Sequence, residues 1–260
     1  MLIARDGPVA GSLSGGCLEA EVAERAREVM RTGRAELMIF DTRRRFGCNG
    51  ALEVVIEKVR EEFLSEIAVR NHRREPCFVA TTIAEGSRLI EDPESMEDIS
   101  LLQRIDPPIR LLVFGEGPDN NAICGMAALL GWQVAIHQDA AELGIHCDDW
   151  TAAIVKTHNY GRDFAFLRAL LAHKLRYIGL MGPRARREQL LGDLLDTGIE
   201  PGPNLFAPAG IDLGASAPET IALSIVAEIQ AVFGRGTGQS LRERKFPIHA
   251  PDDAPVAMSA

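Results

Sequence analysis

Two of the five cysteines stand beside glycines, in places where a thiol can do chemistry. Cys17 follows Gly15 and Gly16 and comes just before an apolar pattern typical of a helix. Cys48 lies in the glycine-flanked turn 47–50, after three consecutive arginines. Helix N-termini and arginines both stabilise a thiolate, which can ligate a metal, attack an electrophile or carry sulfur. For Cys17 the alternative is a small buried residue in a tight turn, and for Cys48 it is a solvated hairpin with a buried cysteine.

The remaining cysteines, Cys77, Cys124 and Cys147, are scattered along the chain. No two of the five have C-x-x-C spacing. An odd and scattered set does not fit a disulfide framework or a structural zinc site. The sequence therefore predicts free thiols in a reducing compartment.

A glycine turn of the kind that binds phosphates follows a short apolar run in the second half of the chain. Gly115 and Gly117 match the first two glycines of G-x-G-x-x-G, between a predicted strand and a predicted helix. Asn120 takes the third position, and Glu116 places a carboxylate where a pyrophosphate would approach. Asp139 is at the spacing expected for a residue that contacts a ribose. The pattern predicts a Rossmann-like fold and leaves dinucleotide binding as a hypothesis.

Two later loops also follow predicted strands, where open α/β sheets bind their ligands. His158 and Asp163 fit an acid–base pair or a polar clamp, and a capping network around a turn is the alternative. Arg184, Arg186 and Arg187 open the next predicted helix, where they oppose its dipole. A bound anion such as a phosphate would explain them, and a solvated basic helix face is the alternative.

The first two thiols must be positioned by the N-terminal elements. An apolar stripe that begins at Leu18 predicts a helix that ends at Gly33. Residues 2–16 are expected to hold one short strand at most. Further strands are predicted over 35–41, 51–59 and 76–83.

From Arg110 onward, short apolar runs alternate with helical patterns, which predicts a parallel sheet covered by helices on both faces. The last helix has a capping-box pattern, with Ser216 as N-cap and Glu219 three residues later. Predicted strands are 110–114, 132–137, 152–157 and 176–180, and predicted helices are 118–130, 162–173 and 184–195.

The expected fold class is α/β, with a small N-terminal α+β domain followed by a Rossmann-like, mostly parallel, doubly wound sheet. Two consecutive prolines at 107–108 mark the expected boundary. The predicted organisation is an N-terminal domain with its linker over 1–106, a Rossmann-like domain over 107–235 and a tail over 236–260.

Composition and charge exclude several classes of protein. The chain has a net charge of −9 and a pI near 5.2, which argues against a general binder of nucleic acid or anionic membranes. No apolar run reaches the roughly 18 residues of a membrane span, and the start lacks the apolar core of a signal peptide. We therefore expect a cytoplasmic protein without a membrane or nucleic-acid partner.

Taken in order, these motifs resemble the XdhC/CoxI family, the xanthine dehydrogenase accessory factors. The N-terminal match rests on the Gly-Gly-Cys-Leu-Glu run at 15–19 and the Gly-Cys-Asn-Gly turn at 47–50. The C-terminal match covers 114–118, 157–160, 177–180, 182–184, 207–215, 218–222 and 227–229. Family members have a further strand region upstream, so the first domain is expected to be shortened at its start.

The resemblance implies a chaperone more than an enzyme. Such a protein binds molybdenum cofactor (molybdopterin) as cargo, supports its sulfuration by a cysteine desulfurase and inserts it into a xanthine dehydrogenase-class molybdoenzyme. Cys17 would hold or shield the cofactor, and any contact with metal would be with its molybdenum. The cofactor-binding residues that the resemblance implies are Gly15, Gly16, Cys17, Glu19, Cys48, Gly115, Gly117, His158 and Arg184.

Two other functions compete with the chaperone. The first is an NAD(P)-dependent oxidoreductase that uses the Gly115 turn, with His158 as acid or base. The second is a non-catalytic scaffold whose thiols are all buried. A homodimer is also expected, because the absent upstream strand would leave a sheet edge to be covered.

Overall fold

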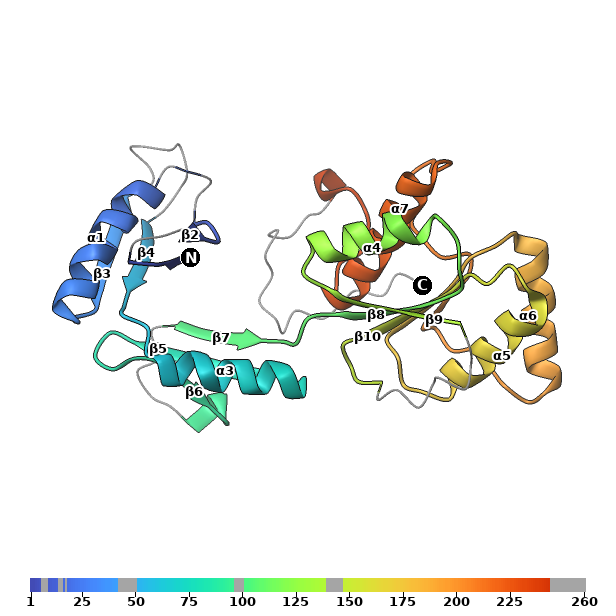
Figure 1. Cartoon of the computed structure of the whole chain (residues 1–260), viewed down its shortest axis with the longest axis horizontal. Helices are drawn as coiled ribbons and strands as arrows, with labels where there is room; N and C mark the ends of the chain where they lie inside the picture. The colour runs from blue at the N-terminus through green and yellow to red at the C-terminus, as the bar shows by residue number, and fades with distance from the viewer. Residues whose placement is uncertain are drawn as a thin grey trace. The chain divides into compact units, whose positions relative to one another are not determined.

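The computed structural model describes residues 1–5, 9–13, 16, 18–41, 51–95, 101–138 and 147–243. The chain divides into two compact units, Met1–Pro107 and Pro108–Ala260, and each is described by itself (Figure 1). The turn expected at 47–50 and most of the expected tail at 236–260 lie outside the described residues.

The N-terminal unit is built around helix α1 (Glu19–Thr32) and the antiparallel pair β3 (Glu36–Asp41) and β4 (Ala51–Ile56). The predicted helix is confirmed, and Gly33 ends it with a left-handed φ of 71°. One small core joins the apolar face of α1 to the hairpin, and it contains Leu18, Val22, Ala26, Val29, Met38, Phe40 and Ile56.

A second sheet in this unit consists of β5 (Cys77–Thr82) between β6 (Gly86–Ile90) and β7 (Leu101–Ile105), all antiparallel. Strand β5 confirms the strand predicted over 76–83. The sequence pattern did not predict β6, β7 or helix α3 (Glu61–Arg73), which precedes this sheet. The missed elements bury little: α3 has no buried residue and every residue of β7 is exposed, so their apolar patterns are weak.

The first residues differ from the expectation of one short strand at most. Two strands of two residues each, β1 (Leu2–Ile3) and β2 (Val9–Ala10), pair antiparallel. The prediction was wrong because strands this short leave no alternation to detect.

The C-terminal unit holds a five-stranded, all-parallel sheet, as predicted. Its strand order is β9-β8-β10-β11-β12. The strands are β8 (Arg110–Phe114), β9 (Gln133–His137), β10 (Thr151–Val155), β11 (Tyr177–Leu180) and the unpredicted β12 (Leu205–Phe206).

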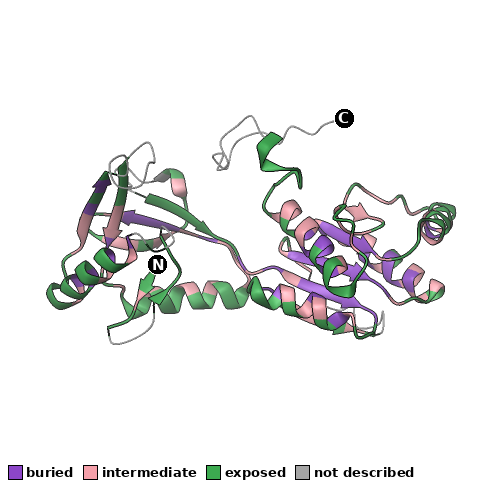
Figure 2. Cartoon of the chain, turned by 90° about the horizontal axis from the view of Figure 1, so that it is seen from above, coloured by how far each residue is buried: buried purple, intermediate pink, exposed green. Residues whose placement is uncertain are grey.

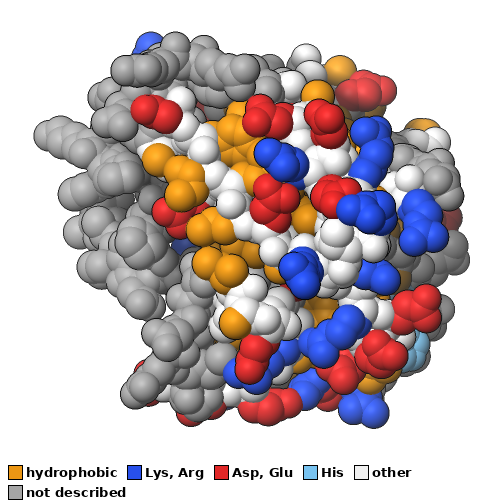
Figure 3. Space-filling model, turned by 90° about the vertical axis from the view of Figure 1, so that its left-hand side faces the viewer, with side chains coloured by type: hydrophobic (Ala, Val, Ile, Leu, Met, Phe, Trp, Pro, Cys, Tyr) orange, Lys and Arg blue, Asp and Glu red, His pale blue; other side chains and the backbone are white. Residues whose placement is uncertain are grey.

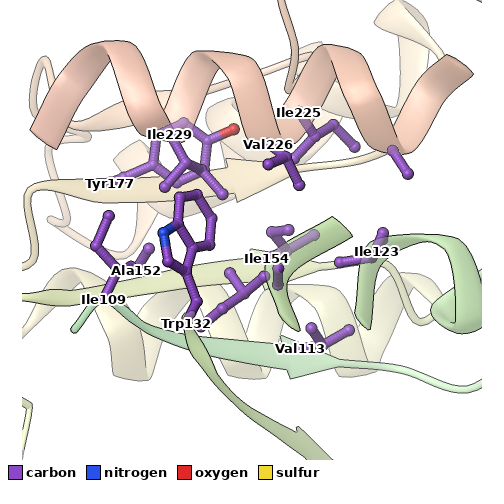
Figure 4. Close-up of a cluster of buried hydrophobic side chains, with 13 residues drawn as sticks. Ile109, Val113, Ile123, Trp132, Ala152, Ile154, Tyr177, Ile225, Val226 and Ile229 are labelled. Atoms are coloured by element: carbon purple, nitrogen blue, oxygen red, sulfur yellow. The ribbon is translucent and has the colours of Figure 1, made fainter. Parts of the chain in front are cut away.

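Helices cover both faces of this sheet, which makes it doubly wound. On one face, α4 (Asn120–Leu129) and α7 (Pro218–Phe233) pack over Val113 and Ile154, as Figure 4 shows. On the other face, α5 (Tyr160–Leu171) and α6 (Arg184–Asp196) pack over Leu112 and Ala153. Figure 2 shows the contrast between the units, since the buried residues are concentrated in the strands of this sheet.

The start of α7 differs in detail from the predicted capping box. Ala217 is the N-cap residue and Pro218 opens the helix. Thr220, instead of Glu219, closes the cap, because its hydroxyl accepts the backbone N–H groups of Ser216 and Ala217. The apolar face predicted for this helix is confirmed, with Ile225 and Ile229 fully buried.

None of the helices that the structure describes is long and apolar enough to cross a membrane. The chain ends its described part in a short 3-10 turn, η3 (Leu241–Glu243). A second such turn, η1 (Pro93–Ser95), follows β6.

Two neighbouring leucines in α6 allow a test of how this helix packs on the C-terminal sheet. Leu194 is fully buried against the sheet, whereas Leu195 is 53% exposed. We expect Leu194→Ala to lower the free energy of unfolding by about 2–5 kcal/mol, because it leaves a cavity. Leu195→Ala is the matched control and should change it by no more than about 0.5 kcal/mol.

Both tryptophans, Trp132 and Trp150, belong to the C-terminal unit, so their fluorescence during denaturant unfolding reports on this unit. Equal effects of the two leucine substitutions would contradict the described packing of α6.

Candidate functional site

The carboxyl ends of the five parallel strands form one edge of the C-terminal sheet. After β8 the chain crosses to β9 on one side, and it then returns to β10 on the other side of β8. This reversal is a topological switch point, where open α/β sheets bind ligands. The candidate site of this unit is therefore the set of loops after β8, β10, β11 and β12.

The glycine turn after β8 is shaped by close approach of the neighbouring chain segment. Gly115 and Gly117 have φ values of 132° and 142°, which L side chains rarely adopt. A Cβ atom on Gly115 would lie 2.7 Å from the carbonyl oxygen of Lys156, and one on Gly117 would lie 2.5 Å from Oδ1 of Asp119. Both glycines are therefore required by the packing of this turn.

A buried lysine lies beneath the turn. Lys156, directly after β10, is only 1% exposed. Its Nζ donates to Oδ1 of Asp119 at 2.8 Å, to Oδ1 of Asn120 at 2.7 Å and to the carbonyl oxygen of Glu116 at 3.3 Å. These three bonds use all the protons of the ammonium group, so Lys156 ties the glycine turn to the end of β10.

Asn120 explains why the third glycine of the motif is not needed. Its side chain is buried, and Nδ2 donates to the carbonyl oxygen of Gly115 at 3.0 Å. The turn is thus closed on itself by the residue that the sequence analysis treated as a departure. Lys156 was missed altogether, although a lysine directly after the apolar run Thr151–Val155 was a signal in the sequence.

The loop after β10 presents His158 and holds Asp163. His158 is exposed and has a left-handed φ of 54°. Asp163 is fully buried; its carboxylate accepts the backbone N–H and the hydroxyl of Thr157 and pairs with the guanidinium of Arg186. Of the two interpretations, the structure supports the capping network for Asp163, which joins the loop after β10 to the start of α6.

The start of α6 carries the predicted arginines without any acidic residue in its first turn. Arg184 is exposed, whereas Arg186 is committed to Asp163. The Nε atoms of Arg186 and Arg187 are buried and have no hydrogen-bond partner among the described residues. Arg184 is thus the arginine of this turn with the most room to meet an anion.

The loop after β12 is held by a carboxylate of α7. Oε2 of Glu228 accepts the backbone N–H of Gly210 at 2.7 Å and the hydroxyl of Tyr177 at 2.8 Å. Tyr177 is itself fully buried and stacked on Phe206, with ring centroids 4.6 Å apart. This bond network fixes the last of the loops at the edge of the sheet.

The loop before α1 is the second candidate site, in the N-terminal unit. Gly16 has a φ of 115°, and the carboxylate of Glu19 accepts the backbone N–H groups of Leu13, Gly16 and Leu18 among the described residues. Cys17 and Gly15 lie outside the described residues. The predicted Cys48 and Asp139 lie outside them as well.

A polar pocket of about 650 Å³ lies elsewhere in the N-terminal unit. None of the predicted site residues lines it. Its charged side chains have both signs, and they come from Glu57, Lys58, Arg60, Glu61, Glu62 and Glu85. Figure 3 shows a similar mixture on one face of the molecule, where acidic, basic and apolar side chains are interspersed. Among the described residues, no group of three or more His, Cys, Asp or Glu could hold a metal ion.

Comparison with protein families identifies the chain. Residues 111–229 match the XdhC Rossmann domain, and residues 1–41 match the model of the XdhC and CoxI family. The chain belongs to the XdhC and CoxI family. The two matched segments contain the glycine turn after β8 and the loop before α1, which are the two candidate sites.

Individual relatives of this XdhC-family chain are similar over most of its length. It is 28% identical to a protein of Bacillus subtilis (strain 168) named as a probable xanthine dehydrogenase subunit, over 88% of this chain and 86% of that protein. It is 27% identical to the molybdenum cofactor insertion chaperone PaoD of Escherichia coli (strain K12), over 89% and 77%. A crystal structure described as a xanthine dehydrogenase from Bacillus halodurans superposes with a TM-score of 0.75 at 25% identity, over 91% and 86%.

The contacts of Lys156 predict a large effect of removing its charge. We expect Lys156→Met to lower the free energy of unfolding by at least about 2 kcal/mol, because Asp119 and Asn120 lose their buried donor. Lys174→Met is the control, since Lys174 is exposed. Denaturant unfolding followed by tryptophan fluorescence measures both, and a K156M variant as stable as the control would contradict the role of Lys156.

The two tyrosines of the chain, both in this unit, predict an alkaline titration. Burial, the hydrogen bond to Asp193 and that carboxylate's charge raise the pKa of Tyr160 to about 12. Burial and then the charge of Glu228 raise the pKa of Tyr177 still further. A raised pKa stabilises the folded state below the unfolded value of about 10, and this stabilisation is lost as pH rises above it.

Absorbance at 295 nm should therefore show little tyrosinate at pH 11 in the folded protein and two tyrosinates in denaturant. Tyr160→Phe should remove the step near pH 12 and leave the later one. Two tyrosines that titrate near pH 10 in the folded protein would rule out these environments.

Proposed function

We propose that this protein binds molybdenum cofactor as cargo and inserts it into a xanthine dehydrogenase-class molybdoenzyme. The observation that carries the proposal is the similarity over 89% of the chain to a protein named as a molybdenum cofactor insertion chaperone. The two segments that match the family, residues 1–41 and 111–229, contain the loop before α1 and the glycine turn after β8. These are the two candidate ligand sites. A chaperone of this kind needs groups that hold a cofactor and release it, and it needs no catalytic machinery of its own.

Two sets of residues are proposed to hold the cargo. In the N-terminal unit, Cys17 would offer a soft thiolate to the molybdenum or its sulfur, and Gly15, Gly16 and Cys48 complete the proposed set. Glu19, the first residue of α1, belongs to the same proposed set. Gly115, Gly117, His158 and Arg184 form the second set, in the C-terminal unit. There, the exposed Arg184 and the nearby buried Nε atoms of its helix support a site for the phosphate of the cofactor.

The proposal includes two protein partners and a cellular location. A cysteine desulfurase would supply sulfur to the bound cofactor, and the client would be a cytoplasmic molybdoenzyme. The homodimer expected from the sequence remains a prediction.

A second candidate is an NAD(P)-dependent oxidoreductase, which the all-parallel sheet and its glycine turn favour. The charges of the turn argue against dinucleotide binding. Glu116 is exposed beside the position of a pyrophosphate, and the ammonium of Lys156 is already paired with Asp119. We therefore place this function second.

The role of Cys17 predicts the result of a binding experiment. Purified protein should bind molybdopterin, and Cys17→Ala should reduce the retained cofactor by about tenfold or more, because the soft ligand is lost. Cys124→Ala, which removes a thiol from α4, is the matched control. The cofactor retained after gel filtration is measured by the fluorescence of its oxidised pterin.

Equal retention by Cys17→Ala and wild type would remove the role given to Cys17. Absence of molybdopterin binding by wild type, together with saturable binding of NADH or NADPH, would replace the first candidate function by the second.

A further inference from the structure

The turn after β8 carries a carboxylate that the packing of the turn does not use. Glu116 lies between Gly115 and Gly117, and its side chain is exposed. Within the described parts of the chain, this carboxylate makes no hydrogen bond or ion pair. The side chain can therefore contact another molecule without giving up a contact of the fold.

The backbone that carries Glu116 is fixed by groups beneath it. The carbonyl oxygen of Gly115 accepts Nδ2 of Asn120 at 3.0 Å, and that of Gly117 accepts the backbone N–H of Asn120 at 3.2 Å. Between them, the carbonyl oxygen of Glu116 accepts Nζ of Lys156 at 3.3 Å. A ligand that binds to Glu116 thus meets a preorganised backbone, which lowers the entropic cost of binding.

The charge of Glu116 decides the sign of the turn. Lys156 and Asp119 form an ion pair of 2.8 Å, so their charges offset each other. One negative charge is left at the exposed tip, at Glu116. A turn that binds phosphate presents the opposite sign. The tip therefore fits a ligand group that donates hydrogen bonds better than it fits a phosphate.

The charge changes from negative to positive along the edge of the sheet. Strand β10 lies between β8 and β11, so the loop with His158 lies between the turn of Glu116 and the loop that leads to Arg184. All three side chains are exposed. The ends of β8 and β11 are separated by two strand spacings, which is about 10 Å. The edge thus offers a carboxylate on one side and a guanidinium on the other.

Molybdopterin has donors and a negative charge at opposite ends. Its pterin begins with an amino-pyrimidinone ring, in which a ring N–H and an amino group lie side by side. A carboxylate accepts two such parallel N–H groups with its two oxygens, as it does from an arginine. The phosphate is attached at the far end of the three fused rings, a length comparable with two strand spacings.

We propose that Glu116 binds the amino-pyrimidinone edge of the pterin and so determines which way round the cargo lies, with its phosphate toward Arg184. This assignment rests on the proposed function, because it takes molybdopterin as the cargo. It also makes Glu116 a specificity residue. The carboxylate attracts the donors of a pterin and repels the pyrophosphate of a dinucleotide at the same turn.

The test measures the affinity of the full chain for two probes by their pterin fluorescence. The probes are molybdopterin and hydroxymethylpterin, which has the amino-pyrimidinone ring but no phosphate. Glu116→Gln should weaken the binding of both by about tenfold or more, because glutamine lacks the charge and the second acceptor oxygen. Glu200→Gln is the matched control, since Glu200 is also exposed and lies between α6 and β12. It should leave both affinities unchanged.

A second variant tests the direction of the cargo. Arg184→Gln should weaken the binding of molybdopterin by about tenfold, because a charged partner of the phosphate is lost. It should leave the binding of hydroxymethylpterin unchanged. A purely structural role of either residue would not separate the two probes in this way. Both side chains are exposed, and tryptophan fluorescence during denaturant unfolding should show wild-type stability for each variant.

The outcomes separate this proposal from the proposed function. If wild type binds molybdopterin and Glu116→Gln binds it equally well, the role of Glu116 fails and the proposed function stands. Tighter binding of molybdopterin by Glu116→Gln would also overturn the proposal, because the phosphate would then lie at the turn. Failure of hydroxymethylpterin to compete with bound molybdopterin would overturn it as well.

The reverse result is equally distinct. If wild type binds hydroxymethylpterin through Glu116 but does not bind molybdopterin, the pterin site stands and the proposed function fails. Binding of neither probe by wild type would overturn both.

Discussion

The burial of Lys156 is the constraint on which the C-terminal unit depends. Strand β10 lies in the middle of the parallel sheet, and helices cover both of its faces, so every residue from Thr151 to Val155 is buried. The chain then places an ammonium group where water cannot reach it. Such a group must be paired and hydrogen-bonded. Asp119 and Asn120 meet this need, and in doing so they fix the start of α4 against the end of β10.

The same constraint shapes the glycine turn. The backbone of Lys156 leaves room only for glycine at 115, and its partner Asp119 crowds position 117. Asn120 closes the turn from the other side. A glycine motif usually indicates a place for a ligand's phosphate. Here the lysine and its partners use much of the turn for the protein's own packing.

Carboxylates position the loops in both units. Glu19 accepts hydrogen bonds from the loop before α1, and Glu228 accepts one from the loop after β12. Asp163 links the loop after β10 to α6 through Thr157 and Arg186. In each case the acceptor lies on a helix whose apolar face is buried, and at least one donor lies on a loop, at Gly16, Thr157 and Gly210. The packed helices thus fix the positions of these loops, which lie within the two matched segments, residues 1–41 and 111–229.

The sequence by itself determined the class of the fold and the family. Periodicity placed α1 and the repeated strands and helices of the parallel sheet, because these elements bury a regular set of apolar side chains. The weakly buried α3, β6 and β7 gave no such pattern and were missed. Only the tertiary structure decided which polar residues act together. Lys156 with Asp119, Asp163 with Arg186, and Glu228 with Gly210 lie between 18 and 37 residues apart in the sequence. Their pairing follows from the order of strands in the sheet, and no local spacing records that order.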